Sequence, residues 1–424
     1  MTKINSINRT SLMPNYAPAA FIPVRGKKSV LWDEQGKDYI DFGGGIAVTC
    51  LGHSHPQLNK VLKEQSTKLW HVSNYLYNKP ALELSKMLAD KTFADKVFFS
   101  NSGNEANEAA IKLARKYYFD QGKPEKHEII VFTNAFHGRS MLNITAGDST
   151  FQKTGFGPLL QGFKRAKFND LNSVKKTVSK KTAAIFVEPI LGESGIIRAE
   201  NPFLEGLRKL ANEKDCLLIF DEVQSGIGRT GTLMAYMGYG VKPDISTLAK
   251  GLGGGIPIGA TLTTGKIAKA FQPGTHGSTF GGNPLACEVA KKVVEIVSTQ
   301  KVLNGVMKKT FNFHEKLNKL SEKFDLFEDV RSAGLWICCD FKKIKAKDFI
   351  DACYKKGLIL VQAAGENTIR IAPSLIISDK EIEEGFKRFE KAVKALKKLL
   401  RDYFNFINLA ITFRKEVSFS ATIS

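Results

Sequence analysis

Two adjacent carboxylates, Asp221 and Glu222, directly follow an apolar run that begins at Leu217. A short apolar run of this kind is typical of a strand that is buried in a parallel sheet. The carboxyl end of such a strand is the edge at which open α/β sheets bind their ligands. A strand-end aspartate can instead cap the following turn, so the pair alone indicates a candidate site without naming its chemistry.

A lysine in unusual surroundings, Lys250, follows the apolar run 245–249 and precedes the glycine-rich segment 251–255. Burial of a charged lysine is unfavourable unless the lysine is paired or deprotonated. A desolvated lysine with a lowered pKa is what Schiff-base chemistry requires. The same pattern also fits a surface lysine before a flexible turn, and these two interpretations stay open at this point.

The segment 100–108 indicates a phosphate site, because small residues lie between a predicted strand and the start of a predicted helix. A helix start presents free N–H groups to an anion, although Glu105 and Glu108 are also ordinary partners of the helix dipole. A strand-end aspartate, a desolvated lysine and a phosphate cradle are together what pyridoxal 5'-phosphate requires. We therefore predict this cofactor.

Two other patterns suggest different chemistry and fail in context. The segment 226–231 matches GxGxxG, but polar residues separate it from the preceding strand, and glycine and proline residues interrupt any following helix. His53 and His55 lack a nearby third ligand, so no metal site is expected. The sequence also contains neither HExxH nor a GxSxG nucleophile elbow.

The composition is that of an ordinary globular protein, with 424 residues, 43% hydrophobic residues and a net charge of +20. The excess lysines are scattered and form no basic block, so we expect no nucleic-acid partner. A basic nucleic-acid-binding protein remains the alternative of another class, and it would show steeply salt-dependent affinity for DNA. The sequence shows neither a secretory signal nor a long apolar run, so we expect a cytoplasmic protein with no membrane partner. It also has no CxxC pair, and its cysteines are expected to be reduced thiols.

Apolar runs that alternate with helical patterns predict an α/β fold with a mostly parallel central sheet flanked by helices. A β-hairpin is expected over residues 29–42, and 327–395 mix strands with helices. The expected strands are 97–99, 128–132, 183–187, 216–220, 245–249 and 258–263. The expected helices are 57–69, 81–88, 105–118, 203–212 and 285–325.

Over residues 14–398 the chain resembles the class III aminotransferases of pyridoxal-phosphate fold type I, and most closely their acetylornithine and succinylornithine branch. The resemblance rests on Asn15–Gly26, Leu51–Pro56, Asn101–Arg115, Asn134–Ser140, Glu188–Gly195, Phe220–Gly231, Ala249–Gly259 and Thr275–Cys287. It implies a large cofactor domain and a small α+β domain made from both chain ends. The expected boundaries are 1–56 and 291–398 for the small domain, 57–290 for the large domain, and 399–424 for a tail of unknown role.

The resemblance also implies roles for residues around the cofactor. Lys250 would be the Schiff-base lysine, and Asp221 the partner of the pyridine nitrogen. The other residues implied to bind the cofactor are Ser102, Gly103 and Asn104 at its phosphate, Phe136 on its ring face, Gln224 near its ring hydroxyl, Glu222 and Val223 beside Asp221, and Thr279 from a second subunit. A homodimer follows from the role of Thr279.

Substrate residues are implied in the same way. Arg139 resembles the arginine that binds the substrate carboxylate, with Ser278 beside the acylated donor and Tyr16 near the substrate. Arg370 resembles a second carboxylate-binding arginine, which Glu193 masks while the donor is bound. The implied reaction passes the δ-amine of N2-acetylornithine to 2-oxoglutarate in arginine biosynthesis. Succinylornithine, N-succinyl-diaminopimelate, 4-aminobutyrate and ornithine remain alternative donors.

Three positions depart from the family pattern. Asn104 stands where alanine or threonine is commoner, and we expect its backbone to do the binding. Ser194 replaces a usual glycine, which predicts a stiffer turn at Glu193. Ile46 stands where ornithine aminotransferases tend to have tyrosine, which argues against free ornithine as the donor.

Overall fold

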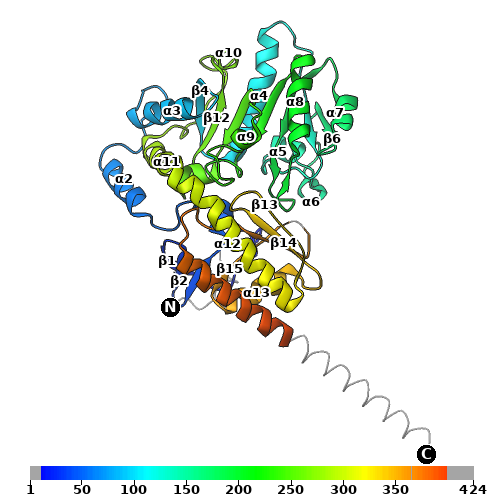
Figure 1. Cartoon of the computed structure of the whole chain (residues 1–424). Coiled ribbons are helices and arrows are strands. Elements are labelled where there is room, and N and C mark those ends of the chain that lie inside the picture. Colours follow the sequence, from blue (N-terminus) through cyan, green and yellow to red (C-terminus); the bar gives the residue numbers. More distant parts are fainter. Residues whose placement is uncertain (1–10, 364, 399–424) are drawn as a thin grey trace, which may run out of the picture.

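Seven strands of the described part form a central sheet (Figure 1). The computed structural model describes residues 11–363 and 365–398. In order across the sheet the strands are β4 (Lys96–Ser100), β12 (Gly259–Thr263), β11 (Ile245–Leu248), β10 (Leu217–Asp221), β7 (Thr182–Val187), β5 (Glu128–Phe132) and β6 (Phe163–Ala166). The strands from β11 to β6 are parallel, and β12 is antiparallel to both of its neighbours. The predicted mostly parallel sheet is confirmed.

The central strands are continuous apolar runs because helices cover both faces of the sheet. All residues of β7, β10 and β11 are buried, as expected for a doubly covered parallel sheet. Strand β6 was missed by the sequence prediction. It is an edge strand with the sequence Phe-Lys-Arg-Ala, and only Ala166 is buried, so it lacks the apolar signal.

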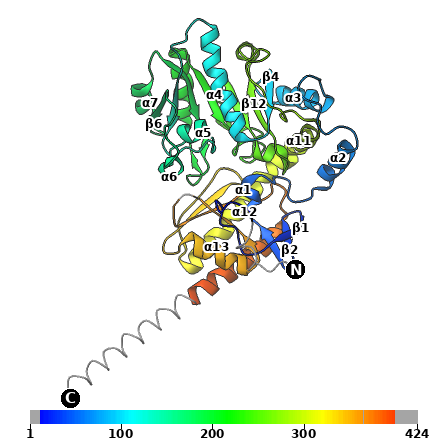
Figure 2. The same cartoon turned by 180° about the vertical axis from the view of Figure 1, so that it is seen from behind.

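Helices α4 (Gly103–Asp120) and α8 (Asn201–Glu213) cover opposite faces of the sheet, as the front and back views show (Figures 1 and 2). Alternate side chains of β5 enter the two cores. Ile129 and Val131 pack in the same cluster as α4, whereas Ile130 and Phe132 pack with Leu204 of α8. This alternation follows from the two-residue repeat of a strand.

The smaller part of the molecule combines both ends of the described chain, as predicted. One of its sheets has the order β1-β2-β3-β15 and the other β13-β14-β17-β16. Their strands are β1 (Pro23–Lys27), β2 (Val30–Asp33), β3 (Asp38–Asp41), β13 (Phe327–Ser332), β14 (Ile337–Phe341), β15 (Leu358–Ile359), β16 (Val361–Gln362) and β17 (Thr368–Ile371). Because β15 pairs with β3, segments more than three hundred residues apart share one sheet.

Long helices connect and cover these sheets (Figure 1). They are α11 (Pro284–Val297), α12 (Gln300–Phe324), α13 (Ala346–Lys355) and the helical residues 379–398. The domain boundary expected at 290–291 lies inside α11. The predicted tail at 399–424 lies outside the described residues. Among the residues that are described, no helix is long and apolar enough to cross a membrane.

The remaining elements are short or lie at the periphery. They are α1 (Gly44–Ala47), α2 (Pro56–Ser66), α3 (Lys79–Lys91), α5 (Met141–Ala146), α6 (Thr150–Lys153), α7 (Leu171–Thr177), β8 (Ile190–Leu191), β9 (Ile197–Arg198), α9 (Ala235–Tyr239), the 3-10 helix η2 (Lys250–Gly253) and α10 (Gly265–Ala268). The hairpin predicted over 29–42 is β2 and β3.

Candidate active site

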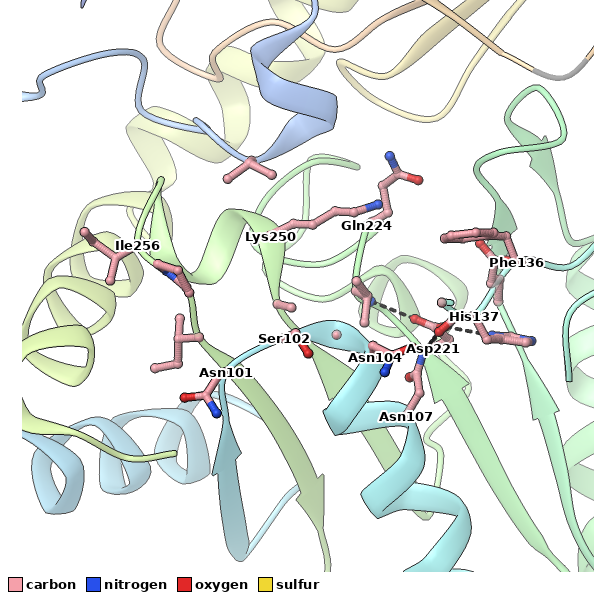
Figure 3. A pocket seen from close by; sticks show the side chains of 18 of the residues that line it. Asn101, Ser102, Asn104, Asn107, Phe136, His137, Asp221, Gln224, Lys250 and Ile256 are labelled. Carbon is pink, nitrogen blue, oxygen red and sulfur yellow. Dashed lines mark hydrogen bonds and ion pairs between the residues drawn. The ribbon is translucent and has the colours of Figure 1, made fainter. Parts of the chain in front are cut away.

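A cavity of about 330 Å³ opens at the carboxyl ends of β7, β10 and β11, beside the first turn of α4 (Figure 3). Its lining residues come from segments that are far apart in the sequence. They are Val48, Asn101, Ser102, Gly103, Asn104, Asn107, Phe136, His137, Gly138, Glu188, Asp221, Val223, Gln224, Ala249, Lys250, Gly255, Ile256, Pro257 and Ile258. The cavity therefore brings together Asp221, Lys250 and the predicted phosphate cradle.

Asp221 ends β10 and is only 5% exposed, and three donors hold its carboxylate. His137 Nδ1 lies 2.7 Å from Oδ2, and Asn107 Nδ2 donates to the same oxygen at 2.8 Å. The amide of Val223 donates to Oδ1 at 3.0 Å. The ring of His137 stacks on Phe186. These contacts fix the orientation of the carboxylate, as a partner of a heterocyclic nitrogen requires.

Lys250 begins η2 two residues after the end of β11, and its backbone has a φ of +42°. This left-handed conformation is unfavourable for a residue with a side chain, and such strain is concentrated at functional sites. Burial lowers the pKa of the Lys250 ammonium, and the charge of Arg370 acts in the same direction. The carboxylates of Glu193 and Asp221 oppose that shift. A lysine with a lowered pKa is a better nucleophile and proton carrier.

The first turn of α4 borders the cavity and has the form of an anion site. Ser102 caps this helix, and its Oγ accepts a hydrogen bond from the Glu105 amide. The amides of Gly103 and Asn104 belong to the first turn, where helix geometry provides no intrahelical acceptor. A Cβ at Gly103 would lie 2.6 Å from Val223, so glycine allows the helix start to approach the β10 edge.

Gln224 and Phe136 complete the part of the cavity that faces Asp221. Gln224 is 8% exposed, and its Nε2 has no hydrogen-bond partner among the residues that the structure describes. A buried donor of this kind calls for an acceptor on a bound group. The half-buried ring of Phe136 offers a face for stacking. With Lys250, Asp221 and the α4 amides, these groups fit a phosphorylated pyridine aldehyde.

Glu188, which sequence reasoning did not single out, also lines the cavity. It directly follows β7, whereas Asp221 is the last residue of β10, and this position after an apolar run was the available signal. Its carboxyl accepts hydrogen bonds from the amides of Phe136 at 2.9 Å and Gly192 at 3.2 Å. Burial, and then the charge of Asp221, raise the pKa of Glu188 well above its usual value.

Glu222 does not line the cavity, although it is adjacent to Asp221. Its carboxyl accepts hydrogen bonds from the amides of Ala235 and Tyr236, at the start of α9. Burial raises the pKa of Glu222 to about 7. The structure thus separates the two carboxylates: one faces the cavity and the other holds the start of a helix.

Glu193 and Arg370 form an ion pair, with Oε1 and Nη1 2.8 Å apart. Arg370 lies in β17 and is 2% exposed, whereas the Glu193 side chain is 35% exposed. Burial acts to raise the pKa of Glu193, but the charge and hydrogen bond of Arg370 outweigh it and lower the pKa. The resemblance implies that Glu193 masks Arg370, and in the structure these two residues form an ion pair.

The predicted substrate residues Arg139, Ser278 and Tyr16 lie outside the cavity lining, as does Thr279, which was expected to bind the cofactor of a second subunit. Arg139 is exposed, and its guanidinium carbon lies 5.8 Å from the centre of the Phe136 ring. Ser278 Oγ accepts a hydrogen bond from Asn101 Nδ2 at 3.1 Å, which places it at the rim. Thr279 is exposed, and Tyr16 is 83% exposed and away from the cavity in this chain.

His53, which was set aside as a metal ligand, has a structural contact instead. Its Nε2 lies 2.8 Å from Asp41 Oδ2. Within residues 11–363 and 365–398, no three His, Cys, Asp or Glu side chains are grouped so that they could hold a metal.

Comparison with known proteins decides the family. The chain matches the family described as Aminotransferase class-III over residues 12–393. The chain belongs to the class-III aminotransferases. These enzymes depend on pyridoxal phosphate, and the resemblance stated from the sequence is confirmed.

Relatives of this aminotransferase are similar over nearly their whole length. An acetylornithine aminotransferase of Pseudomonas putida is 51% identical over 390 residues, which are 91% of this chain and 96% of that protein. A succinylornithine transaminase/acetylornithine aminotransferase of Pseudomonas aeruginosa is 51% identical over 388 residues, 91% of this chain and 95% of that protein.

Solved structures give the same result for the fold. The N-acetylornithine aminotransferase from Stenotrophomonas maltophilia has a TM-score of 0.80 and 37% identity, over 91% of this chain and 98% of that one. The ornithine aminotransferase from Toxoplasma gondii has a TM-score of 0.88 and 30% identity, over 93% of this chain and 95% of that one. Fold type I is thereby confirmed.

Proposed function

We propose that this aminotransferase passes the δ-amine of N2-acetylornithine to 2-oxoglutarate, giving N-acetylglutamate 5-semialdehyde and glutamate, as in arginine biosynthesis. The observation that carries the proposal is the convergence of Lys250, Asp221 and the α4 amides on one cavity. The donor is inferred from relatives 51% identical that are named acetylornithine aminotransferases. Because one such relative is also named a succinylornithine transaminase, N2-succinylornithine is the second candidate donor.

The residues that line the cavity would hold pyridoxal phosphate. The amides of Gly103 and Asn104 would bind its phosphate, and Phe136 would stack on its ring. Gln224 Nε2 would donate to the ring hydroxyl, and Asp221 would keep the ring nitrogen protonated. When bound, the cofactor supplies an electron sink and carries the amine between the two substrates.

Lys250 is the proposed proton carrier. A lysine whose pKa is lowered by burial can take a proton at its Nζ and return it, which an ordinary lysine at neutral pH does poorly. Its Nζ would remove the proton from the carbon that bears the amine of the substrate. The nearby carboxylates of Glu193 and Asp221 stabilise the ammonium that results.

Two arginines would let one site accept two acids of different length. Arg139 at the rim would bind the carboxylate of the acylated donor with its two parallel N–H groups. Arg370, which pairs with Glu193 in the structure, would stay paired with it while the donor is bound. The second carboxylate of 2-oxoglutarate would then replace Glu193 as the partner of Arg370.

A homodimer is part of the proposal. Exposed apolar side chains lie beside the segment that carries Thr279, and Tyr75 and Tyr77 are 97% and 92% exposed. Asn74 Nδ2 donates to the carbonyl of Ser278 at 2.6 Å, which joins the two segments. A surface of this kind marks a protein interface. If a second copy of the chain covered it, Thr279 of this chain would reach the cavity of that second copy. Light scattering should give twice the chain mass, and a monomer would contradict the dimer.

Replacement of Lys250 tests the mechanism. We expect Lys250→Ala to lower turnover of N2-acetylornithine with 2-oxoglutarate by about 10³-fold or more, while purified protein still binds the cofactor noncovalently. Lys266→Ala, which changes an exposed lysine after β12, is the matched control and should keep its rate. Full activity in Lys250→Ala would overturn the mechanism.

A panel of amine donors tests the substrate. The wild-type holoenzyme should have its highest kcat/KM with N2-acetylornithine when it is compared with N2-succinylornithine, N-succinyl-diaminopimelate, 4-aminobutyrate and ornithine. A higher value for any other donor would reassign the substrate and leave the role of Lys250 standing.

A further inference from the structure

Asn104 connects the phosphate cradle to the segment that carries Arg139. It is the second residue of α4, and its Oδ1 accepts three hydrogen bonds. The donors are the amides of Arg139 and Ser140 and the Nδ2 of Asn143, each at 2.9 Å. Backbone amides can only donate, so the oxygen of the Asn104 amide must face them.

The neighbouring backbone is shaped to accept this side chain. Gly138 has a φ of +133°, and a Cβ there would lie 2.4 Å from Asn104 Oδ1. Glycine therefore lets the segment pass directly over the asparagine oxygen. Asn143 Nδ2 also donates to the backbone carbonyl of Asn104 at 2.8 Å, which ties α5 to the first turn of α4.

The hydrogen bonds that Asn104 accepts also hold the two residues directly before helix α5. Helix α5 begins after Ser140, whose side chain makes no capping bond. Asn104, which lies on helix α4, accepts from the amides of Arg139 and Ser140 just before α5, and no pattern near α5 in the sequence indicates these contacts.

We propose that Asn104 is a positioning residue that sets the place of Arg139 for the carboxylate of the substrate. The inference rests on the proposed role of Arg139. Asn104 acts through the Arg139 backbone, and so determines where the guanidinium stands beside the Phe136 ring. The backbone amide of Asn104 holds the phosphate and its side chain holds the arginine. One residue thereby links the cofactor to the substrate carboxylate.

Two variants separate these contributions in the holoenzyme. Asn104→Ala removes the acceptor and keeps the backbone amide, whereas Asn104→Asp keeps an oxygen that all three donors can reach. We expect Asn104→Ala to raise the KM for N2-acetylornithine on the order of tenfold, with kcat and cofactor affinity changed by less than about twofold. Asn104→Asp should return the KM to near the wild-type value.

Binding and exchange provide readouts that do not need turnover. The probe is N-acetylnorvaline, which carries the acylated carboxylate end of the donor and lacks the δ-amine. Its Kd should rise in Asn104→Ala on the order of tenfold and return in Asn104→Asp. Hydrogen–deuterium exchange at the amides of Arg139 and Ser140 should be faster in the alanine variant alone.

A matched control accounts for simple destabilisation. Asp170→Ala removes the cap of α7, where the aspartate accepts from the Ser173 amide at 2.9 Å, away from the cavity. It should leave the KM and the probe Kd unchanged. If Asn104→Ala does not fold, Asn104→Thr removes the same carbonyl and fills more of the space.

The outcomes are distinct. An alanine variant with wild-type KM and probe Kd would overturn the role of Asn104, as would an aspartate variant that does not restore them. A wild-type enzyme that binds N-acetylnorvaline but does not convert N2-acetylornithine would overturn the proposed reaction. In that case the exchange and probe measurements would still decide whether Asn104 positions Arg139.

Discussion

The cofactor end and the substrate end of the site are built differently. At the cofactor end, Asp221 ends one strand of the central sheet and Lys250 follows the neighbouring strand. Asp221 is buried, with three donors on its carboxylate. At the substrate end, Glu193 follows β8 and Arg370 lies in a strand of a different sheet, and one ion pair joins them. The cofactor end therefore holds Asp221 in one orientation. At the substrate end, a carboxylate of a substrate can replace that of Glu193 as the partner of Arg370.

The backbone of the turn that carries Glu193 is held by contacts with two other segments of the chain. Ser194 Oγ donates to the carbonyl of Asn134, and Arg331 Nε donates to the carbonyl of Gly195 at 2.6 Å. Arg331 is also paired with Asp340 of β14. Exchange at the substrate end therefore requires movement of the Glu193 side chain rather than of its backbone. The contact of Ser194 agrees with the stiffer turn that its sequence position predicts.

The largest expected effect is at the cofactor end. Asp221→Asn keeps the shape of the side chain but removes its charge, so kcat at saturating cofactor should fall on the order of 10²- to 10³-fold. Asp215→Asn, which changes a residue just before the other end of β10, is the matched control. Steady-state kinetics of both variants check the prediction. Equal losses in the two would show that strand stability, rather than the Asp221 charge, governs the rate.

An intermediate effect, confined to one substrate, is expected at the other end. Arg370→Lys removes the two-pronged donor, so the KM for 2-oxoglutarate should rise on the order of tenfold or more. The KM for N2-acetylornithine should change little, because Arg139 binds that acid. Separate KM measurements for each substrate decide the matter. Parallel changes in both values would mean that the two ends are not independent.

The smallest effect is on stability, and two glutamates should show it with opposite signs. The pKa of Glu222 is raised to about 7, whereas an unfolded glutamate titrates near about 4.3. Between these values the folded state binds more protons than the unfolded state, so this carboxyl makes the protein less stable as pH rises. As the pH rises from about 4.3 to 7, the Tm of Glu222→Gln should therefore increase relative to the Tm of the wild type.

Glu193 provides the contrasting variant. Its pKa is lowered by Arg370, so its contribution to stability is present above the pKa of the unfolded glutamate and is lost as pH falls through the lower, folded value. The Tm deficit of Glu193→Gln should shrink as the pH falls through the acid range. Thermal melts of both variants across pH test the pair. The same sign in both would contradict the assigned environments.

The parts of the site that local patterns predicted are those at strand ends. Asp221, Lys250 and the α4 start each follow an apolar run, and parallel strands bring their carboxyl ends to one edge. Glu222 shows the limit of that reasoning. Neighbouring residues at a strand end point to opposite sides, so adjacency to Asp221 did not place it in the cavity. Glu188 carried the same signal, since it directly follows the apolar run of β7, and it was overlooked. His137 follows no apolar run, and only the folded chain brings its ring to Asp221.

The sequence by itself determined the α/β class, most strand positions and the aminotransferase family, because apolar periodicity and local motifs are properties of short segments. Only the tertiary structure decided which distant groups meet. Glu193 and Arg370 are 177 residues apart, and the acceptor for the Arg139 amide is Asn104, on helix α4. Such contacts depend on strand order and on how the two parts of the chain pack, and no local pattern records either.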